Sequence, residues 1–187
     1  MKARRLVLID NYDSFTYNLV YLLKRLGAPP IILHNDIGLD ELGRHKFTHL
    51  LISPGHGSPS QSRICIEAIK SFAPIVPILG ICLGHQCIAT AFGGEVSPMH
   101  APKHGVTSSI SFVDNPLFKG LKQGLCVGLY HSLVVTKPGD CEVLATSHEG
   151  FIMALKHKNW PCYGIQFHPE SILQEGGKKI LKNFLAF

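Results

Sequence analysis

Residues 80–86, with the sequence GICLGHQ, place Cys82 between two glycines that stand two positions before and after it. The segment follows an apolar run at residues 75–79 and precedes another at residues 88–92, which indicates a strand, a sharp turn and a short helix. The glycines leave room for the tight backbone of a nucleophile elbow. A thiol in that turn would lie at the carboxyl end of a strand and at the N-terminus of a helix, where a thiolate is favoured. Cys82 is therefore a candidate nucleophile.

A base for this thiol is found in the segment QFHPES at residues 166–171. His168 directly follows an apolar strand pattern, and Glu170 stands two residues later, where its carboxylate could accept a hydrogen bond from the imidazole. An HPE tripeptide alone would fit a surface histidine at a turn equally well. Combined with the elbow at Cys82, it predicts a Cys-His-Glu triad for acyl chemistry.

Acyl chemistry also needs hydrogen-bond donors for the developing oxyanion. Gly55, His56 and Gly57 follow a predicted strand, so their backbone N–H groups could approach a ligand closely. With the N–H of Leu83, the residue after the candidate nucleophile, they could form an oxyanion hole. Taken alone, this loop would be interpreted as a turn just as readily.

The elements that must position these residues change in character along the chain. The first half alternates apolar runs with helical patterns, whereas the second half has short strand patterns separated by turns. In a parallel sheet the strand ends at Asp10, Ser53 and Cys82 would meet at one edge. The sequence thus predicts an α/β fold of three layers, with a mostly parallel central sheet, helices on both faces and a mixed or antiparallel extension. The expected strands cover residues 6–9, 31–33, 49–52, 75–79, 106–113, 125–129, 142–146, 152–155 and 162–167, and the expected helices cover residues 15–26, 39–44, 62–72, 88–92 and 177–187.

The composition is that of a compact enzyme. Of the 187 residues, 45% are hydrophobic and 17% are charged, which argues against disorder, and the length fits one domain over residues 1–187. The formal net charge is +5, but no Lys/Arg-rich run is interleaved with aromatic residues, so no nucleic-acid partner is expected. Neither a signal-peptide pattern nor an apolar run of membrane length is present, which predicts a cytoplasmic protein without membrane contact.

Cysteine and histidine usage gives no sign of a metal centre. The 6 cysteines form no C-x-x-C pair, and the 11 histidines include no H-x-x-x-H pair within a predicted helix. We expect free thiols in a reducing compartment, and neither a metal nor another cofactor.

The motifs together resemble those of the class I, or triad, glutamine amidotransferases, whose fold is flavodoxin-like. The resemblance covers essentially the whole chain and is closest to the small glutaminase subunits, component II, of anthranilate synthase and aminodeoxychorismate synthase. The segments that carry it are DNYDSFTYN at residues 10–18, SPG-x-G at residues 53–57, GICLGHQ at residues 80–86, YHSL at residues 130–133 and FHPES at residues 167–171.

This resemblance implies that the substrate is L-glutamine. Cys82 would attack its side-chain amide, His168 would protonate the leaving ammonia and then activate water, and Glu170 would hold the imidazole. Gln86 lies one helical turn after the nucleophile and could face the same pocket. The substrate-binding residues implied by the family are Gly55, His56, Gly57, Leu83, Gln86, Ser132 and Leu133.

The resemblance also implies a partner. Ammonia would pass to a chorismate-binding synthase subunit, component I, in a heterodimer or heterotetramer. The product would be anthranilate, on the tryptophan route, or 4-amino-4-deoxychorismate, on the folate route. Nothing in these 187 residues decides between the two, because the acceptor site would lie on the other chain.

Two positions depart from the family pattern, and two other functions compete with the family's. His56 stands where proline is usual, and Val106 stands where lysine commonly follows His104-Gly105. A non-catalytic flavodoxin-like binding module would be expected to have lost a triad residue. A related cysteine hydrolase or peptidase would lack the pocket set implied here. The residues therefore favour an active glutaminase.

Overall fold

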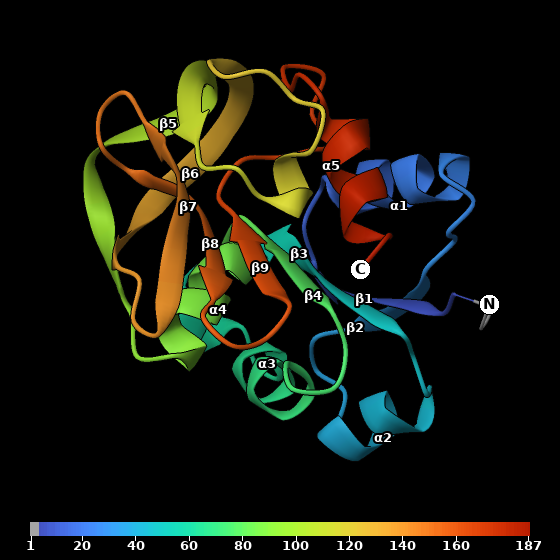
Figure 1. Ribbon diagram of the computed structural model, residues 1–187. Helices are drawn as coiled ribbons and strands as arrows, with labels where there is room; N and C mark the ends of the chain where they lie inside the picture. The colour runs from blue at the N-terminus through green and yellow to red at the C-terminus, as the bar shows by residue number, and fades with distance from the viewer. Residues whose placement is uncertain (1–3) are drawn as a thin grey trace.

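The computed structural model describes residues 4–187, which build one nine-stranded sheet in the order β2-β1-β3-β4-β9-β8-β7-β5-β6 (Figure 1). Neighbours in the first five strands pair in parallel, and all later neighbours pair antiparallel. The parallel strands are β1 (Leu6–Asn11), β2 (Ile31–His34), β3 (His49–Gly55), β4 (Ile78–Ile81) and β9 (Cys162–Ile165). The antiparallel extension contains β5 (Glu95–Phe112), β6 (Leu125–Lys137), β7 (Cys141–Ser147) and β8 (Ile152–His157).

Helices cover both faces of the parallel strands. Side chains of a strand alternate between faces, so Leu6 and Leu8 pack with α1 (Thr16–Arg25) and α5 (Gly177–Phe184). Val7 and Ile9 belong to the other core, together with α2 (Leu39–Arg44), α3 (Cys65–Phe72) and α4 (Leu83–Ala91). Burial on both faces explains why β1 is a continuous apolar run. The predicted three-layer α/β fold is confirmed (Figure 1). Within residues 4–187, no helix has the length and apolar character needed to span a bilayer.

The strand predicted over residues 75–79 was placed three residues too early. Ile75 lies in a turn with 70% of its surface exposed. The backbone N–H groups of Ile75 and Val76 both donate to the carbonyl of Phe72, so they close the end of α3 rather than join the sheet. Pro77 has no backbone N–H to donate, and the pairing of β4 with β3 starts at Ile78.

The two long strands of the extension were predicted too short. β5 begins at Glu95 rather than at residue 106, and its pairing with β6 is interrupted between Pro98 and Lys103 and again between His104 and Val106. These irregularities break the alternation of polar and apolar residues from which a strand is recognised. β6 continues to Lys137, so the YHSL segment lies within a strand.

Candidate active site

Cys82 is the single residue between β4 and α4, and its backbone is strained. Its φ of 52° and ψ of −101° lie in a region that L-residues seldom adopt. Such strain costs about 1–3 kcal/mol and persists only where the surroundings enforce it. Here the Cys82 N–H donates to the carbonyl of Ile165 (2.9 Å), and the Cys82 carbonyl accepts from the N–H of Gln86 (3.1 Å).

The glycines around the elbow are required by close backbone approach. A Cβ at Gly80 would collide with the carbonyl oxygen of Gly84, and a Cβ at Gly84 would lie 2.6 Å from the carbonyl oxygen of Ile52. Both contacts are shorter than real Cβ contacts, so α4 can begin directly against β4 and β3 only because these residues are glycine.

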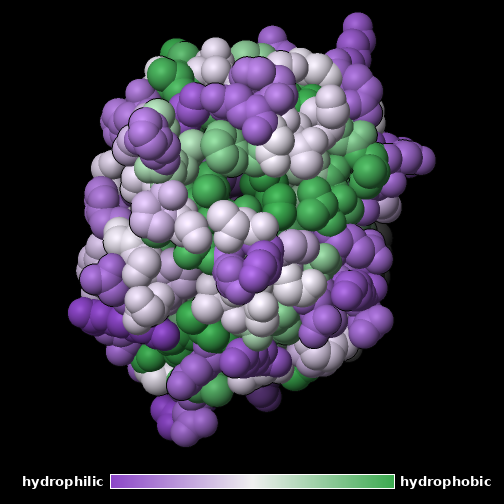
Figure 2. Space-filling model, turned by 90° about the vertical axis from the view of Figure 1, so that its left-hand side faces the viewer, coloured by the Kyte–Doolittle hydropathy of each residue, from purple (hydrophilic) through white to green (hydrophobic). Residues whose placement is uncertain are grey.

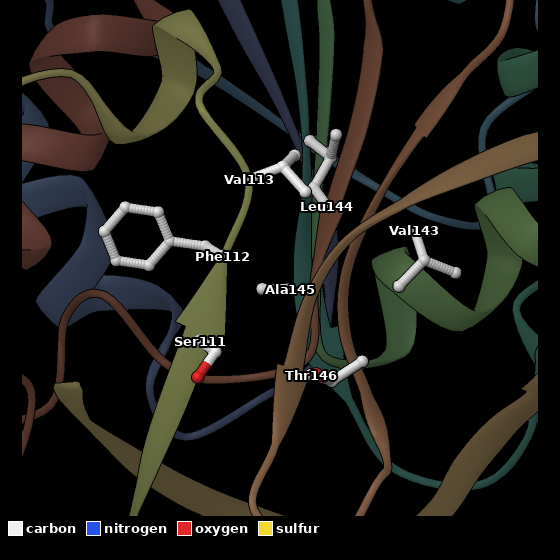
Figure 3. Close-up of a pocket in the computed structure, with 7 residues that line it drawn as sticks. All are labelled: Ser111, Phe112, Val113, Val143, Leu144, Ala145 and Thr146. Atoms are coloured by element: carbon white, nitrogen blue, oxygen red, sulfur yellow. The ribbon is translucent and has the colours of Figure 1, made fainter. Parts of the chain in front are cut away.

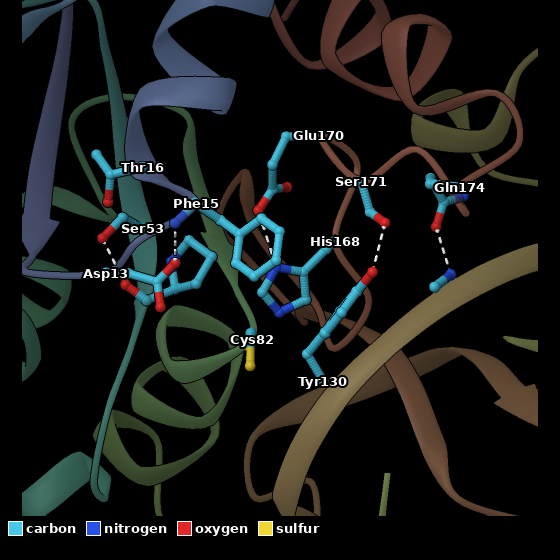
Figure 4. Close-up of polar contacts among 12 residues, drawn as sticks. Asp13, Phe15, Thr16, Ser53, Cys82, Tyr130, His168, Glu170, Ser171 and Gln174 are labelled. Carbon is cyan, nitrogen blue, oxygen red and sulfur yellow. Dashed lines mark hydrogen bonds and ion pairs between the residues drawn. The ribbon is translucent and has the colours of Figure 1, made fainter. Parts of the chain in front are cut away.

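His168 and Glu170 form a buried pair beside the elbow. The Nδ1–H of His168 donates to Oε1 of Glu170 at 2.8 Å, with the two side chains 2% and 0% exposed. Because Glu170 holds Nδ1, Nε2 is the nitrogen left for the thiol, and Figure 4 shows Cys82 on the side of the imidazole away from Glu170. Nε2 has no well-aligned hydrogen-bond partner among the described residues. Catalytic hydrogen bonds are often long or misaligned before substrate binds.

The surroundings favour a protonated imidazole. Burial by itself would lower the pKa of His168, but interaction with the neighbouring Cys82 sulfur and the hydrogen bond and negative charge of Glu170 outweigh burial and raise that pKa to about 10. A histidine of this kind can hold the proton of the thiol as an imidazolium. It can then deliver that proton to a leaving group.

A pocket of about 140 Å³ opens at the elbow. Cys82 lies in its wall, together with every residue that the resemblance assigned to substrate binding. The lining residues are Gly55, His56, Gly57, Cys82, Leu83, Gln86, Tyr130, His131, Ser132 and Leu133. The structure thus brings together segments that are far apart in the sequence, although the part each residue plays toward a substrate stays a prediction.

The end of β3 and the loop after it need glycine close to the elbow. A Cβ at Gly55 would lie 2.7 Å from Cδ2 of Leu83 and 2.5 Å from Cβ of Asn11, and Gly57 has a φ of +80°. The side chain of His56 is exposed at the mouth of the pocket. The backbone at Gly55 therefore lies against Leu83, the residue after Cys82, as the predicted oxyanion hole would require.

Two aromatic residues that the sequence analysis left without a role hold the imidazole. The rings of Phe15 and Tyr130 meet the ring of His168 edge-on, with centroids 5.5 Å and 5.1 Å away. The hydroxyl of Tyr130 is 3.0 Å from Oγ of Ser171, one residue beyond the Glu170 carboxylate (Figure 4). Both aromatic residues lie in motifs noted in the sequence, but their contact with His168 depends on tertiary structure.

The first motif of the chain builds the turn that presents Phe15. Oδ1 of Asp10 accepts from the N–H of Tyr12 (3.0 Å) and from the hydroxyl of Thr16 (2.7 Å), while Oδ2 of Asp13 accepts from the N–H of Phe15 (2.8 Å). Aspartates that bond to the N–H two residues ahead are a recognised turn pattern, which is the signal that could have revealed this arrangement. The turn thus positions a wall of the candidate site.

Another cavity, of about 230 Å³, lies between the end of β5 and β7 (Figure 3). The face formed by the antiparallel extension shows hydrophobic side chains around a hollow (Figure 2). The only polar side chains lining the β5–β7 cavity are the hydroxyls of Ser111 and Thr146, and no ionisable group is among its lining residues. Its larger volume therefore does not make it a better candidate for acyl chemistry than the pocket at the elbow.

A thiol at a strained strand-to-helix turn of an α/β sheet, next to a His-Glu pair, is the arrangement of an α/β enzyme with a cysteine nucleophile. Comparison with known proteins gives the family. Residues 7–186 match the model of the glutamine amidotransferase class-I family. The chain belongs to this family, and the prediction of a glutamine amidotransferase is confirmed.

Similar proteins carry related names. The chain is 47% identical over 184 residues to the aminodeoxychorismate/anthranilate synthase component 2 of Bacillus subtilis, covering 96% of this chain and 95% of the relative. It is 44% identical over 184 residues to the aminodeoxychorismate synthase component 2 of Escherichia coli, covering 96% and 98%. Among solved structures, a putative GMP synthase protein from Thermoplasma acidophilum is 28% identical, with a TM-score of 0.87 over 100% of this chain and 94% of that one.

Proposed function

We propose that this chain hydrolyses L-glutamine to glutamate and ammonia, as the glutaminase component of a chorismate-using synthase. One observation carries the proposal: Cys82, next to the buried His168–Glu170 pair, opens into the same pocket as the backbone of residues 55–57 and 132–133. The lining includes the amide of Gln86 and the polar side chains of Tyr130, His131 and Ser132, which suit the amide and amino-acid groups of glutamine.

The chemistry has two halves. The Cys82 sulfur attacks the side-chain amide carbon of glutamine, and the N–H groups of Gly57 and Leu83 hold the oxyanion. The His168 imidazolium gives its proton to the departing nitrogen, so the carbon–nitrogen bond breaks and ammonia departs. A glutamyl thioester remains on Cys82. Neutral His168 then takes a proton from water, the hydroxide attacks the thioester, and glutamate leaves as the proton returns to sulfur. Glu170 keeps Nδ1 of His168 protonated throughout.

We propose that the partner is a chorismate-binding synthase subunit, because the relatives are named as component 2 of anthranilate and aminodeoxychorismate synthases. Ammonia would pass to that subunit without release to solvent. Since the name of the Bacillus subtilis relative covers both synthases, either product fits. Mixing the chain with each synthase subunit, chorismate and glutamine, followed by product analysis, separates anthranilate from 4-amino-4-deoxychorismate.

We place the partner on the surface behind the triad carboxylate. A groove of about 410 Å³ there is lined in part by Glu170 and Tyr130, and Tyr21 and Ile172 stand on its rim with 65% and 99% of their surfaces exposed. Large exposed apolar side chains gathered at one place are typical of interaction sites. A subunit seated there would press on the loop that carries Glu170, so we expect glutaminase turnover to be slow in the isolated chain and faster in the complex.

The assay that tests the activity measures ammonia release from glutamine with the partner present, beside cleavage of a peptide substrate. Glutamine hydrolysis that disappears in Cys82→Ser supports the proposal. Peptide cleavage with inert glutamine would instead identify a cysteine peptidase.

A further inference from the structure

Gln166 is a buried amide that neither the triad nor the pocket lining includes. It directly follows β9, its backbone N–H donates to the carbonyl of Met153 (2.8 Å), and its surface is 0% exposed. Burying a side-chain amide is costly unless its polar atoms find partners. Both of its polar atoms have partners, and these partners belong to the candidate site.

The side chain of Gln166 links the nucleophile to the pocket wall. Its Nε2 donates to Sγ of Cys82 at 3.5 Å, within the range for a sulfur acceptor. Its Oε1 accepts from Nε2 of Gln86 at 3.1 Å, and that same nitrogen donates to the carbonyl of Leu133 at 3.2 Å. A continuous chain of hydrogen bonds therefore runs from a backbone carbonyl of the pocket to the sulfur.

The Leu133 carbonyl fixes which group donates and which accepts in each of these hydrogen bonds. The Leu133 carbonyl can only accept, so the Gln86 amide must turn its NH₂ group toward it. The second hydrogen of that NH₂ group then faces Gln166, whose side-chain oxygen must accept it. The NH₂ group of Gln166 is thereby left pointing at Cys82.

A donor aimed at sulfur matters more for a thiolate than for a thiol. Hydrogen bonds to an ionised acceptor are roughly twice as strong as neutral ones, and a buried site with low dielectric strengthens them further. We propose that Gln166 is a positioning residue, whose side-chain N–H holds the Cys82 sulfur in place and stabilises its thiolate for attack. This deepens the proposed function and rests on it for the identity of the reaction.

Gln166 would act through Cys82 rather than on the substrate. Gln86 and Leu133 line the pocket, whereas Gln166 does not. Replacing Gln166 should therefore lower kcat for glutamine with little change in KM. A purely structural role would instead lower the amount of folded protein and leave the thiol of the folded fraction as reactive as before.

The first test measures alkylation of Cys82 by iodoacetamide, followed on the Cys82 peptide by mass spectrometry because the chain has 6 cysteines. Gln166→Leu removes the donor, and Gln166→Glu keeps the shape but turns a carboxylate toward the sulfur. We expect both to slow alkylation at pH 7 by about tenfold or more, the scale of one hydrogen bond to a charged group. The pH of half-maximal rate should also move upward.

A matched control replaces a glutamine remote from the sulfur. Gln123 binds only the backbone of Phe112, so Gln123→Leu should leave the alkylation rate unchanged. Because the assay needs no glutamine, a wild-type chain without glutaminase activity would overturn the proposed function while the dependence on Gln166 could still stand. Unchanged alkylation in folded Gln166 variants would overturn the inference alone.

A second measurement keeps the wild-type glutamine and so does not depend on the variants folding. In NMR spectra of ¹⁵N-labelled protein, the side-chain NH₂ of Gln166 should shift and exchange with solvent faster in Cys82→Ala, which lacks the acceptor. An unchanged Gln166 NH₂ resonance would show that no bond to the sulfur is made and would overturn the inference.

Discussion

Nδ1 of His168 lies 2.8 Å from Oε1 of Glu170, and both side chains are removed from solvent. This contact fixes the tautomer of the imidazole and leaves Nε2 free for the thiol of Cys82. We therefore propose that Glu170 acts on Cys82, the proposed nucleophile, only through the histidine.

The first prediction concerns the charge of that carboxylate. Glu170→Gln keeps a hydrogen-bond acceptor for His168 but removes the negative charge that favours the imidazolium. General acid–base catalysis contributes about 10²- to 10⁴-fold, and we expect kcat for glutamine hydrolysis to fall by about 100-fold. Steady-state ammonia release with the partner present measures the effect. A loss below about threefold would show that the charge is dispensable.

The second prediction concerns stability against pH. The pKa of His168 is raised to about 10 in the folded chain, above the usual value of about 6.5 expected when it is unfolded. The folded state then binds its proton more tightly, so this contribution is complete below pH ~6.5 and is lost as pH rises to ~10. Denaturant unfolding of wild type and His168→Gln at several pH values should show their difference shrinking across that window. A constant difference would contradict the raised pKa.

The third prediction concerns the glycine before the elbow. Gly80→Ala puts a Cβ against the carbonyl oxygen of Gly84 and should destabilise the fold by about 1–3 kcal/mol, the usual cost of overpacking. The control is Gly38→Ala, where a Cβ meets nothing within 4 Å. Thermal unfolding of both variants measures the contrast. Equal melting temperatures would show that the backbone at the elbow can shift to accommodate the added Cβ.

The fourth prediction concerns His56, which stands where the family usually has proline. Its side chain is exposed, and both neighbouring glycines are in place. We expect His56→Pro to change glutaminase turnover by less than about tenfold, because backbone groups rather than the imidazole are proposed to hold the oxyanion. A larger loss would give His56 a direct role.

The fifth prediction concerns the partner surface. Ile172→Asp places a charge on the rim of the groove beside Glu170 and should weaken binding of the synthase subunit by more than about tenfold. Ile75→Asp is the matched control, since Ile75 is also exposed but lies in the turn before β4, at the opposite end of that strand from Cys82. Titration of the complex by light scattering or calorimetry distinguishes them. Equal affinities would place the partner elsewhere.

The sequence predicted the fold where its elements carry local signals. The helix expected over residues 39–44 has these bounds in the structure, and β1, β2 and β3 begin at their predicted residues. The strand ends at Asp10, Ser53 and Cys82 belong to adjacent parallel strands, as expected. Strand boundaries were predicted wrongly where backbone hydrogen bonding, and not side-chain polarity, determines where the strand begins. Ile75 is as apolar as a strand residue, but its N–H caps a helix.

The residues of the candidate site differ in how far the sequence alone predicts them. Cys82, His168 and Glu170 follow from residue types next to strand ends, and the structure places them together. The positions of Ser132 and Leu133 could be inferred only from the family, because β6 is irregular where they lie. The edge-on contacts of Phe15 and Tyr130 with His168 had no signal in periodicity, since they join three segments that are far apart in the sequence.

The central claim is that the Cys82 thiolate attacks glutamine. The most direct measurement is ammonia release from glutamine by wild type and Cys82→Ser, each saturated with the synthase subunit, together with mass spectrometry of the acid-quenched enzyme. We predict ammonia and a glutamyl adduct on the Cys82 peptide in wild type, and neither in the variant. Undiminished ammonia release by Cys82→Ser would contradict the account.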